Sequence, residues 1–242
     1  IAGGLAGETR ADVRDERALR EALRAAEPEI VLHLAAQPLV RQSYADPVAT
    51  YAVNVLGTVH LLEAARQCPS VRAIVNVTTD KCYENREWLW GYRESDRLGG
   101  VDPYSSSKAC AELVSAAYRE SFFRQRALGL ATARAGNVIG GGDWAQDRLL
   151  PDFFRAAQAG AALEVRHPEA TRPWQHVLEP LHGYLLLAQQ LFQHGMRFSG
   201  GWNFGPPLQD SSTVRELLDA VVRLVPGAAW KSAPGANPHE AH

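Results

Sequence analysis

Short apolar runs alternate along the chain with segments of helical period. Apolar positions spaced three and four residues apart predict helices over 16–26, 48–67, 149–161, 178–194 and 213–225. Runs short enough to be buried strands cover 30–34, 73–77 and 128–135. Asp102-Pro103 fits an N-cap followed by proline at the first helical position, so a further helix is expected from there to about residue 124. This alternation predicts βα units around a parallel sheet.

Composition narrows the class of protein. The chain has 242 residues, 46% of them hydrophobic, and a formal net charge of -2, which gives no basic field for nucleic acid or an anionic membrane. No run approaches the roughly 18 apolar residues that span a bilayer, so we expect no membrane partner and a cytoplasmic location. The cysteines Cys68, Cys82 and Cys110 lack C-x-x-C spacing, and His239-x-x-His242 offers two ligands where structural zinc takes four. We therefore expect no metal site.

Polar residues follow the predicted strands. They are Ala35-Ala36-Gln37, Thr78-Thr79-Asp80-Lys81 and Gly136-Asn137. Because ligands bind at the carboxyl ends of the strands in an open parallel sheet, the active site is expected among them.

Tyr104 and Lys108 lie four residues apart on the predicted 103–124 helix, so both project from one face. An ammonium beside a phenol lowers its pKa from about 10 and lets it act as a general base. Alone, the pattern is common and fits a half-buried tyrosine with a solvated lysine. Here the helix has its own cap and follows a strand that ends in hydroxyls and a carboxylate, which favours the chemical interpretation.

Five motifs carry a resemblance to a known family. In order they are His33-Leu34-Ala35-Ala36-Gln37, Asn54-x-x-Gly57-Thr58, Thr79-Asp80-Lys81, Tyr104-x-x-x-Lys108 and Arg134-Ala135-Gly136-Asn137-Val138. This order resembles the extended short-chain dehydrogenases/reductases. Three further segments resemble the sugar-nucleotide 4,6-dehydratases of that family that act on CDP-glucose: residues 78–85, 140–144 and 172–177. The resemblance covers nearly the whole chain.

The resemblance implies an α/β fold: a Rossmann-like doubly wound parallel sheet with a smaller α/β substrate-binding domain. Residues 1–136 and 174–202 would form the NAD-binding domain, and 137–173 and 203–242 the domain for the nucleotide sugar. The glycine-rich turn that cradles a pyrophosphate is absent, and Gly3-Gly4-Leu5-Ala6-Gly7 is no substitute because no strand precedes it. We therefore expect the first βα units upstream of residue 1 and an incomplete chain.

The resemblance also implies catalytic roles. Tyr104 would take the proton of the sugar 4-hydroxyl, Lys108 would tune the phenol and hold the nicotinamide ribose, and Thr79 would bond the reacting oxygen. Asp80 would act as the acid on the 6-hydroxyl, provided that burial raises its pKa. Lys81 departs from the commoner pattern, in which a glutamate is the base at C5. It either titrates low or stabilises the enolate while another group removes the proton, and an ordinary surface ion pair of Asp80 with Lys81 is the alternative.

Binding residues follow from the same resemblance. For NAD they are Asp12, Val13, Leu34, Ala35, Ala36, Gln37 and Thr78, together with Tyr104 and Lys108. For the nucleotide sugar they are Asn137, Arg148, Arg172 and Asn203, since arginine suits phosphate. Each has a structural alternative: a tightly packed strand end, a surface arginine or a turn asparagine. His33 and Trp174 are expected in the core.

Two other functions compete with an NAD-dependent 4,6-dehydratase acting on CDP-glucose. A nucleotide-sugar 4-epimerase shares Thr79, Tyr104 and Lys108 but needs no acid to expel water. A non-catalytic dinucleotide-sensing protein of the same fold would yield no ketone product. The helices 48–67 and 103–124 match the helices through which related proteins form dimers, so a homodimer or homotetramer is expected.

Overall fold

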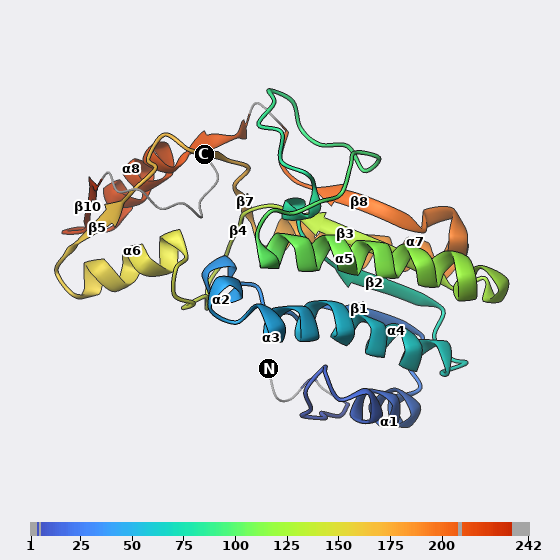
Figure 1. Ribbon diagram of the computed structural model, residues 1–242. Coiled ribbons are helices and arrows are strands. Elements are labelled where there is room, and N and C mark those ends of the chain that lie inside the picture. Colours follow the sequence, from blue (N-terminus) through green and yellow to red (C-terminus); the bar gives the residue numbers. More distant parts are fainter. Residues whose placement is uncertain (1–3, 5, 208–209, 234–242) are drawn as a thin grey trace. The chain divides into compact units, whose positions relative to one another are not determined.

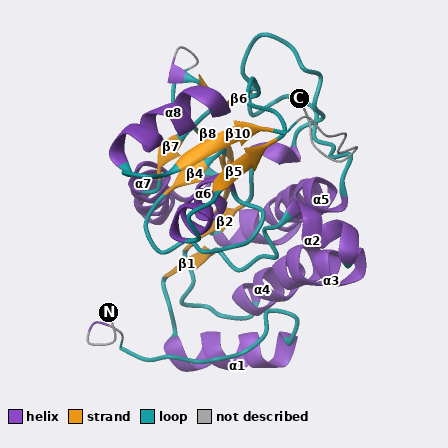
Figure 2. Cartoon of the chain, turned by 90° about the vertical axis from the view of Figure 1, so that its left-hand side faces the viewer, coloured by secondary structure: helices purple, strands orange, loops and turns teal. Residues whose placement is uncertain are grey.

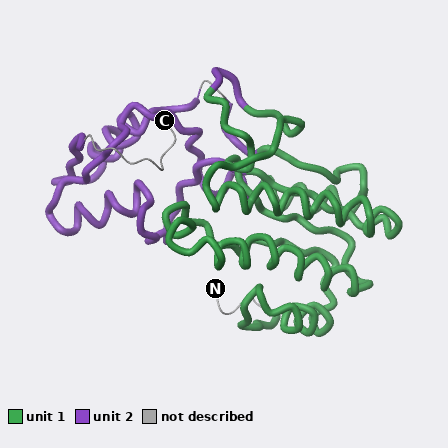
Figure 3. Tube along the Cα trace, viewed as in Figure 1, with its two compact units in different colours: residues 1–87, 92–134, 183–203 green, residues 88–91, 135–182, 204–242 purple. Residues whose placement is uncertain are grey.

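The computed structural model describes residue 4, residues 6–207 and residues 210–233. The chain divides into two compact units (Figure 3). Unit 1 comprises Ile1–Glu87, Tyr92–Arg134 and Gly183–Asn203, and unit 2 comprises Trp88–Gly91, Ala135–His182 and Phe204–His242. That one domain binds a cofactor and the other a substrate stays a prediction. His239 and His242 lie outside the described residues.

A four-stranded sheet forms the centre of unit 1 (Figure 1). Its order is β1 (Ile30–His33), β2 (Ala73–Val77), β3 (Gly129–Ala135) and β8 (Gly200–Phe204). β1, β2 and β3 are parallel, which confirms the predicted parallel sheet. β8 escapes prediction because Gly200 and Gly201 interrupt its apolar pattern.

Helices lie on both sides of this sheet. The bounds are α1 (Glu16–Ala26), α2 (Val40–Ala45), α3 (Pro47–Tyr51), α4 (Gly57–Arg66), α5 (Pro103–Tyr118) and α7 (Leu178–His194). Figure 2 shows the strands between α7 on one side and α3, α4 and α5 on the other. The side chains of Asp15 and Asp102 cap α1 and α5 by accepting from the backbone N–H of Ala18 and Ser105. The sheet and helices thus form the predicted doubly wound layers.

Two of the predicted long helices contain π-helical turns. The 48–67 segment is α3, then the π-helical turn η2 (Ala52–Leu56), then α4. α5 likewise continues through the π-helical turn η4 (Arg119–Phe123) into the 3₁₀ turn η5 (Arg124–Arg126). π-helical turns are rare in proteins overall, and those that occur often lie at functional sites. Hydrophobic periodicity does not reveal them.

The core of unit 1 lies between α1, α4 and the sheet. Its fully buried members include Leu62, Ile74, Phe123 and Leu130. By length and composition alone, the helical run Pro47–Arg66 could also cross a membrane, where the sequence predicted no such segment. Much of α4 packs in this core, and core helices of globular proteins pass the same test.

Unit 2 is built from two helices and short strand pairs. The helices are α6 (Leu149–Gln158) and α8 (Val214–Leu224). The pairs are β4 (Val138–Ile139) with β7 (Gln175–His176), β5 (Ala162–Val165) with β10 (Ala229–Ser232), and β6 (Thr171–Arg172) with β9 (Ser212–Thr213). Phe153 and Leu218 are fully buried in its core, and Trp174 packs against them, as expected.

Candidate active site

The end of β2 leads directly into a polar turn. Thr78 and Thr79 follow the strand and are buried, and the 3₁₀ turn η3 (Asp80–Cys82) comes next. The Thr79 hydroxyl accepts from the Lys81 backbone N–H at 3.4 Å and donates to Asp80 Oδ1 at 3.1 Å. The strand therefore ends with the Thr79 hydroxyl engaged within its own turn.

Tyr104 and Lys108 lie in the first two turns of α5, as their spacing predicts. Both are buried, with 8% and 6% of their surface exposed. Lys108 Nζ donates to the Val77 carbonyl at 3.1 Å, which places the ammonium at the end of β2. Burial lowers the Lys108 pKa to about 8, while the Glu112 carboxylate raises it. A cation one helical turn from a buried phenol can stabilise the phenolate that a proton acceptor requires.

Asp80 and Lys81 are much more exposed. Their side chains are 37% and 44% exposed, and Lys81 Nζ lies 3.9 Å from Asp80 Oδ1. The Asp80 carboxyl is therefore not buried by its surroundings in unit 1. Its role as a proton donor stays a prediction, and so does the role of Lys81.

One asparagine side chain anchors the loop after β1. Asn54 Oδ1 accepts from the Gln37 backbone N–H at 2.8 Å, and Asn54 Nδ2 donates to the Gln37 carbonyl at 3.0 Å. Nδ2 also donates to Ser107 Oγ at 2.9 Å, and Ser107 donates to the Tyr104 carbonyl. The loop with Leu34, Ala35 and Ala36 is thereby tied to α5. Asn54 lies in the π-helical turn η2. A polar residue inside an otherwise apolar helix is the sequence signal that indicates this anchoring role.

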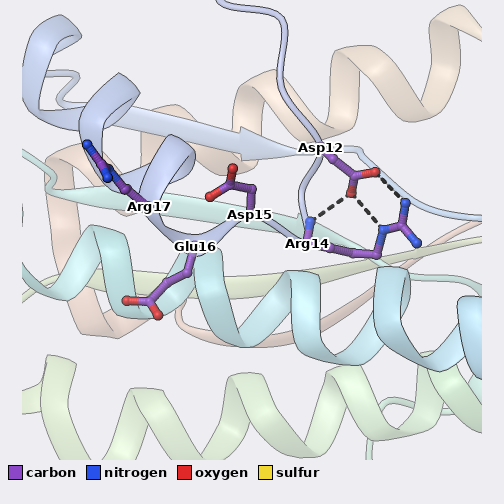
Figure 4. Close-up of a pocket in the computed structure, with 5 residues that line it drawn as sticks. All are labelled: Asp12, Arg14, Asp15, Glu16 and Arg17. Atoms are coloured by element: carbon purple, nitrogen blue, oxygen red, sulfur yellow. Dashed lines mark hydrogen bonds and ion pairs between the residues drawn. The ribbon is translucent and has the colours of Figure 1, made fainter.

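The Asp12–Val13 segment lies against α4. A Cβ on Gly57 would come within 2.9 Å of Val13 Cγ1, so glycine in the Asn54-x-x-Gly57-Thr58 motif permits this close approach. The Asp12 carboxylate accepts from the backbone N–H, Nε and Nη2 of Arg14 (Figure 4). These bonds lower the Asp12 pKa to about 2. Asp12 and Arg14 line a surface pocket together with Asp15, Glu16 and Arg17.

His33 ends β1 and is 6% exposed. Its Nε2 lies 3.4 Å from the Thr58 hydroxyl. Burial and the Lys108 charge lower its pKa to about 4. It is the core histidine that the sequence predicts.

The predicted substrate residues divide between the units. Asn203 belongs to unit 1, where Oδ1 accepts from the Tyr83 hydroxyl at 2.7 Å and Nδ2 donates to the Tyr92 carbonyl at 2.8 Å. A substrate contact by Asn203 stays a prediction, and its amide has a second lone pair on Oδ1 and a second hydrogen on Nδ2 that could make one.

The other three predicted substrate residues belong to unit 2. Asn137 Oδ1 is buried without a hydrogen-bond partner among the described residues. Arg148 Nη1 lies 3.1 Å from Asp143 Oδ2. Arg172 lies in β6, where its Nη1 donates to the Thr171 carbonyl. In the described part of the chain, no group of three or more His, Cys, Asp or Glu residues is arranged to hold a metal.

Fold and site together define a Rossmann-like α/β protein with a tyrosine-lysine pair at the sheet's carboxyl edge. A family model described as GDP-mannose 4,6 dehydratase matches residues 8–201. The chain belongs to this family. The CDP-glucose 4,6-dehydratase of Salmonella typhimurium is 54% identical over 237 residues, which cover 96% of this chain and 66% of that protein. The chain thus spans just under two thirds of this relative's length.

Solved structures agree on the fold. The UDP-glucose 4-epimerase of Thermus thermophilus, in complex with NAD, matches with a TM-score of 0.80 and 28% identity over 96% of this chain and 73% of that chain. The dTDP-glucose 4,6-dehydratase of Streptomyces venezuelae, with NAD bound, matches with a TM-score of 0.79 and 26% identity over 95% and 67%. Both confirm the predicted Rossmann-like class.

Proposed function

We propose that this chain is the greater part of an NAD-dependent sugar-nucleotide 4,6-dehydratase that acts on CDP-glucose. One observation carries the proposal. The Lys108 ammonium is buried at the Val77 carbonyl, beside the Thr78–Thr79 turn and one helical turn from the buried Tyr104. That arrangement suits removal of a proton from a sugar hydroxyl.

The residues present fit part of a dinucleotide site. The loop Leu34–Gln37 has small residues at the edge of the sheet, and Asn54 holds it at Gln37. Asp12 is half-exposed beside this sheet edge, and its carboxylate can accept a further donor, such as an adenine amino group. We assign Asp12, Val13, Leu34, Ala35, Ala36, Gln37, Thr78 and Lys108 to this site. When bound, NAD would accept a hydride from C4 and return one to C6.

The chain's own residues would move the protons. Tyr104, stabilised as a phenolate by Lys108, takes the proton of the 4-hydroxyl, and Thr79 bonds that oxygen. The resulting ketone acidifies the C5 proton, and Asp80 gives a proton to the departing 6-hydroxyl. Because Asp80 is 37% exposed without substrate, the bound sugar must exclude water from it before it can act as the acid. Lys81 then either takes the C5 proton itself as a neutral amine, or stabilises the enolate while another group takes that proton.

The choice of CDP-glucose rests on likeness to the Salmonella typhimurium enzyme. It is also supported by Lys81, where other dehydratases have a glutamate. The unpartnered Asn137 Oδ1 suits a donor on the nucleotide sugar, and Arg148 and Arg172 suit its diphosphate. Asn203 completes the proposed set.

We further propose a homodimer or homotetramer in the cytoplasm. Exposed apolar side chains on the two long helices support an assembly through them: Val48 is 78% exposed, Leu56 52% and Leu113 60%.

A product assay tests the proposal. Full-length protein is incubated with NAD and, separately, with CDP-glucose, dTDP-glucose and UDP-glucose, and alkali-induced absorbance of a 4-keto-6-deoxy sugar is recorded. Product from CDP-glucose alone is expected. Product from dTDP-glucose alone would overturn the choice of nucleotide. A 4-epimer without ketone would favour an epimerase, and no turnover of any sugar would favour a dinucleotide-sensing protein.

A further inference from the structure

Glu112 is a buried carboxylate directly below the candidate active site. It lies on α5 one turn after Lys108 and two turns after Tyr104, and only 3% of its surface is exposed. Its Oε1 accepts from the Thr78 hydroxyl at 2.5 Å, and its Oε2 accepts from Thr132 Oγ1 at 2.7 Å. One carboxylate therefore joins the end of β2, the middle of β3 and the catalytic helix, which run side by side in Figure 1.

Arg134 fixes this carboxylate from β3. Its Nη2 donates to Glu112 Oε2 at 2.6 Å, and both side chains are buried. Its Nη1 donates to the Tyr83 hydroxyl at 2.7 Å and to the Glu94 carbonyl at 3.0 Å. A Cβ on Gly201 would come within 2.5 Å of Nη2, so the guanidinium lies directly against the backbone of β8. The position of Glu112 is thus determined by contacts on several sides.

We propose that Glu112 is a positioning residue of the active site, which ties the Thr78–Thr79 turn to α5 and keeps a negative charge beside the Lys108 ammonium. The proposal rests on the hydride chemistry proposed above. Glu112 itself touches neither cofactor nor substrate. It acts through Thr78, whose neighbour Thr79 is assigned to the reacting oxygen, and through Lys108.

The surroundings of Lys108 single out Glu112 as its counter-charge. Among the described residues, the groups that interact electrostatically with the ammonium are His33 on β1, Cys82 on η3 and Glu112, and Tyr104 lies one turn earlier on α5. Burial and Lys108 lower the His33 pKa to about 4, and burial raises the Cys82 pKa to about 12, so both are neutral near pH 7. Burial also lowers the Lys108 pKa, and the Glu112 carboxylate opposes that effect. Removing its charge should make Lys108 lose its proton at a lower pH.

The test compares Glu112→Gln with Thr132→Val in the full-length protein. Thr132→Val removes one hydrogen bond to Glu112 but keeps the carboxylate, so it is the matched control. The primary measurement is the titration of ¹³C-labelled lysine by NMR. This chain has three lysines, and Lys108→Met assigns the signal. In Glu112→Gln the Lys108 pKa should fall, while in Thr132→Val it should match the parent protein.

Activity gives a second measurement. The alkaline limb of the kcat profile should move to lower pH in Glu112→Gln, with about tenfold lower turnover than the parent at pH 9, as a change of about one pKa unit requires. Glu112→Asp, which restores the charge, should restore the limb. A folded Glu112→Gln protein whose Lys108 titrates as in the parent overturns the proposal. The NMR titration needs no turnover, so it decides this point even if the proposed dehydratase activity is absent.

A double variant covers loss of folding. Glu112→Gln alone leaves the Arg134 charge buried without its partner, whereas Glu112→Gln/Arg134→Met removes both charges together. Its Lys108 pKa should fall by no more than in the single variant, because loss of the Arg134 cation opposes the effect of losing the carboxylate. If circular dichroism shows that neither variant folds, the pair has only a structural role and the proposal is wrong.

Discussion

The buried face of α5 and the exposed Asp80–Lys81 pair after β2 prepare the active site to different degrees. Tyr104, Lys108 and Glu112 are each less than 10% exposed, and Lys108 and Glu112 form hydrogen bonds that fix them. Asp80 and Lys81 are 37% and 44% exposed and approach each other only to 3.9 Å. The groups assigned to proton removal from the 4-hydroxyl are therefore in place before substrate binds. The groups assigned to water elimination must acquire their environment from the substrate.

This difference separates two kinds of catalytic contribution. Buried, fixed groups act through preorganisation, since their electrostatics are set by the fold. Exposed ion pairs are screened by water and contribute little until water leaves. Substitutions of Tyr104 or Lys108 should therefore stop oxidation at C4. Substitutions of Asp80 or Lys81 should stop the later elimination of water.

Tyr104→Phe should have the largest effect. It removes the proposed base from a site that otherwise stays intact, so kcat should fall by about 1,000-fold or more. Tyr118→Phe makes the same substitution at the other end of α5 and should leave kcat near the parent value. Parental turnover by Tyr104→Phe would show that the buried face of α5 does not supply the base.

Acid should lower the free energy of unfolding through the buried side chain of His33. Its pKa is lowered to about 4 in the folded protein, against about 6.5 in the unfolded chain, so the unfolded state binds an extra proton between these values. This contribution to the free energy of unfolding is fully present above pH 6.5 and is lost as the pH falls through 4. The loss is roughly 3 kcal/mol. Urea unfolding at pH 7 and pH 4.5 measures it.

The matched variant is His33→Gln, which keeps a polar side chain without titration. Its stability should fall less than that of the parent over the same pH interval. Equal losses in the two proteins would show that His33 does not cause the acid sensitivity.

Asp80→Asn should uncouple the two halves of the reaction. C4 oxidation should persist, and NADH should be detectable at 340 nm, while release of the 4-keto-6-deoxy product falls by about 100-fold because no acid assists loss of water. Parental product formation by Asp80→Asn would show that Asp80 is not the acid and would favour the epimerase.

Lys81→Met should have the smallest effect, about a tenfold loss of kcat if the ammonium only stabilises an enolate. Lys231→Met is the control, since Lys231 forms an exposed ion pair with Glu164 in unit 2. A loss of 1,000-fold or more would instead identify Lys81 as the base at C5.

Periodicity and motifs predict much of this fold from the sequence. The predicted 16–26, 73–77 and 178–194 segments match α1, β2 and α7 residue by residue, because caps and apolar runs are local signals. β8 and the short strands of unit 2 were missed, since their stability comes from partners distant in sequence. Tyr104 and Lys108 could be recognised from their spacing. Glu112 and Arg134 could not be paired, because their contact depends on how α5 packs on β3.

The π-helical turn at Asn54 has a consequence for how α3 and α4 can vary. A π-helical turn contains one residue more than the equivalent α-helical turn. Deletion of one neighbour, such as Val53, would therefore let the two helices join into one regular α-helix with good local geometry. The Asn54 amide would then rotate away from both Gln37 and Ser107. A single-residue deletion here could leave the fold stable while releasing the loop at the sheet edge, so the length of this helix is itself part of the site.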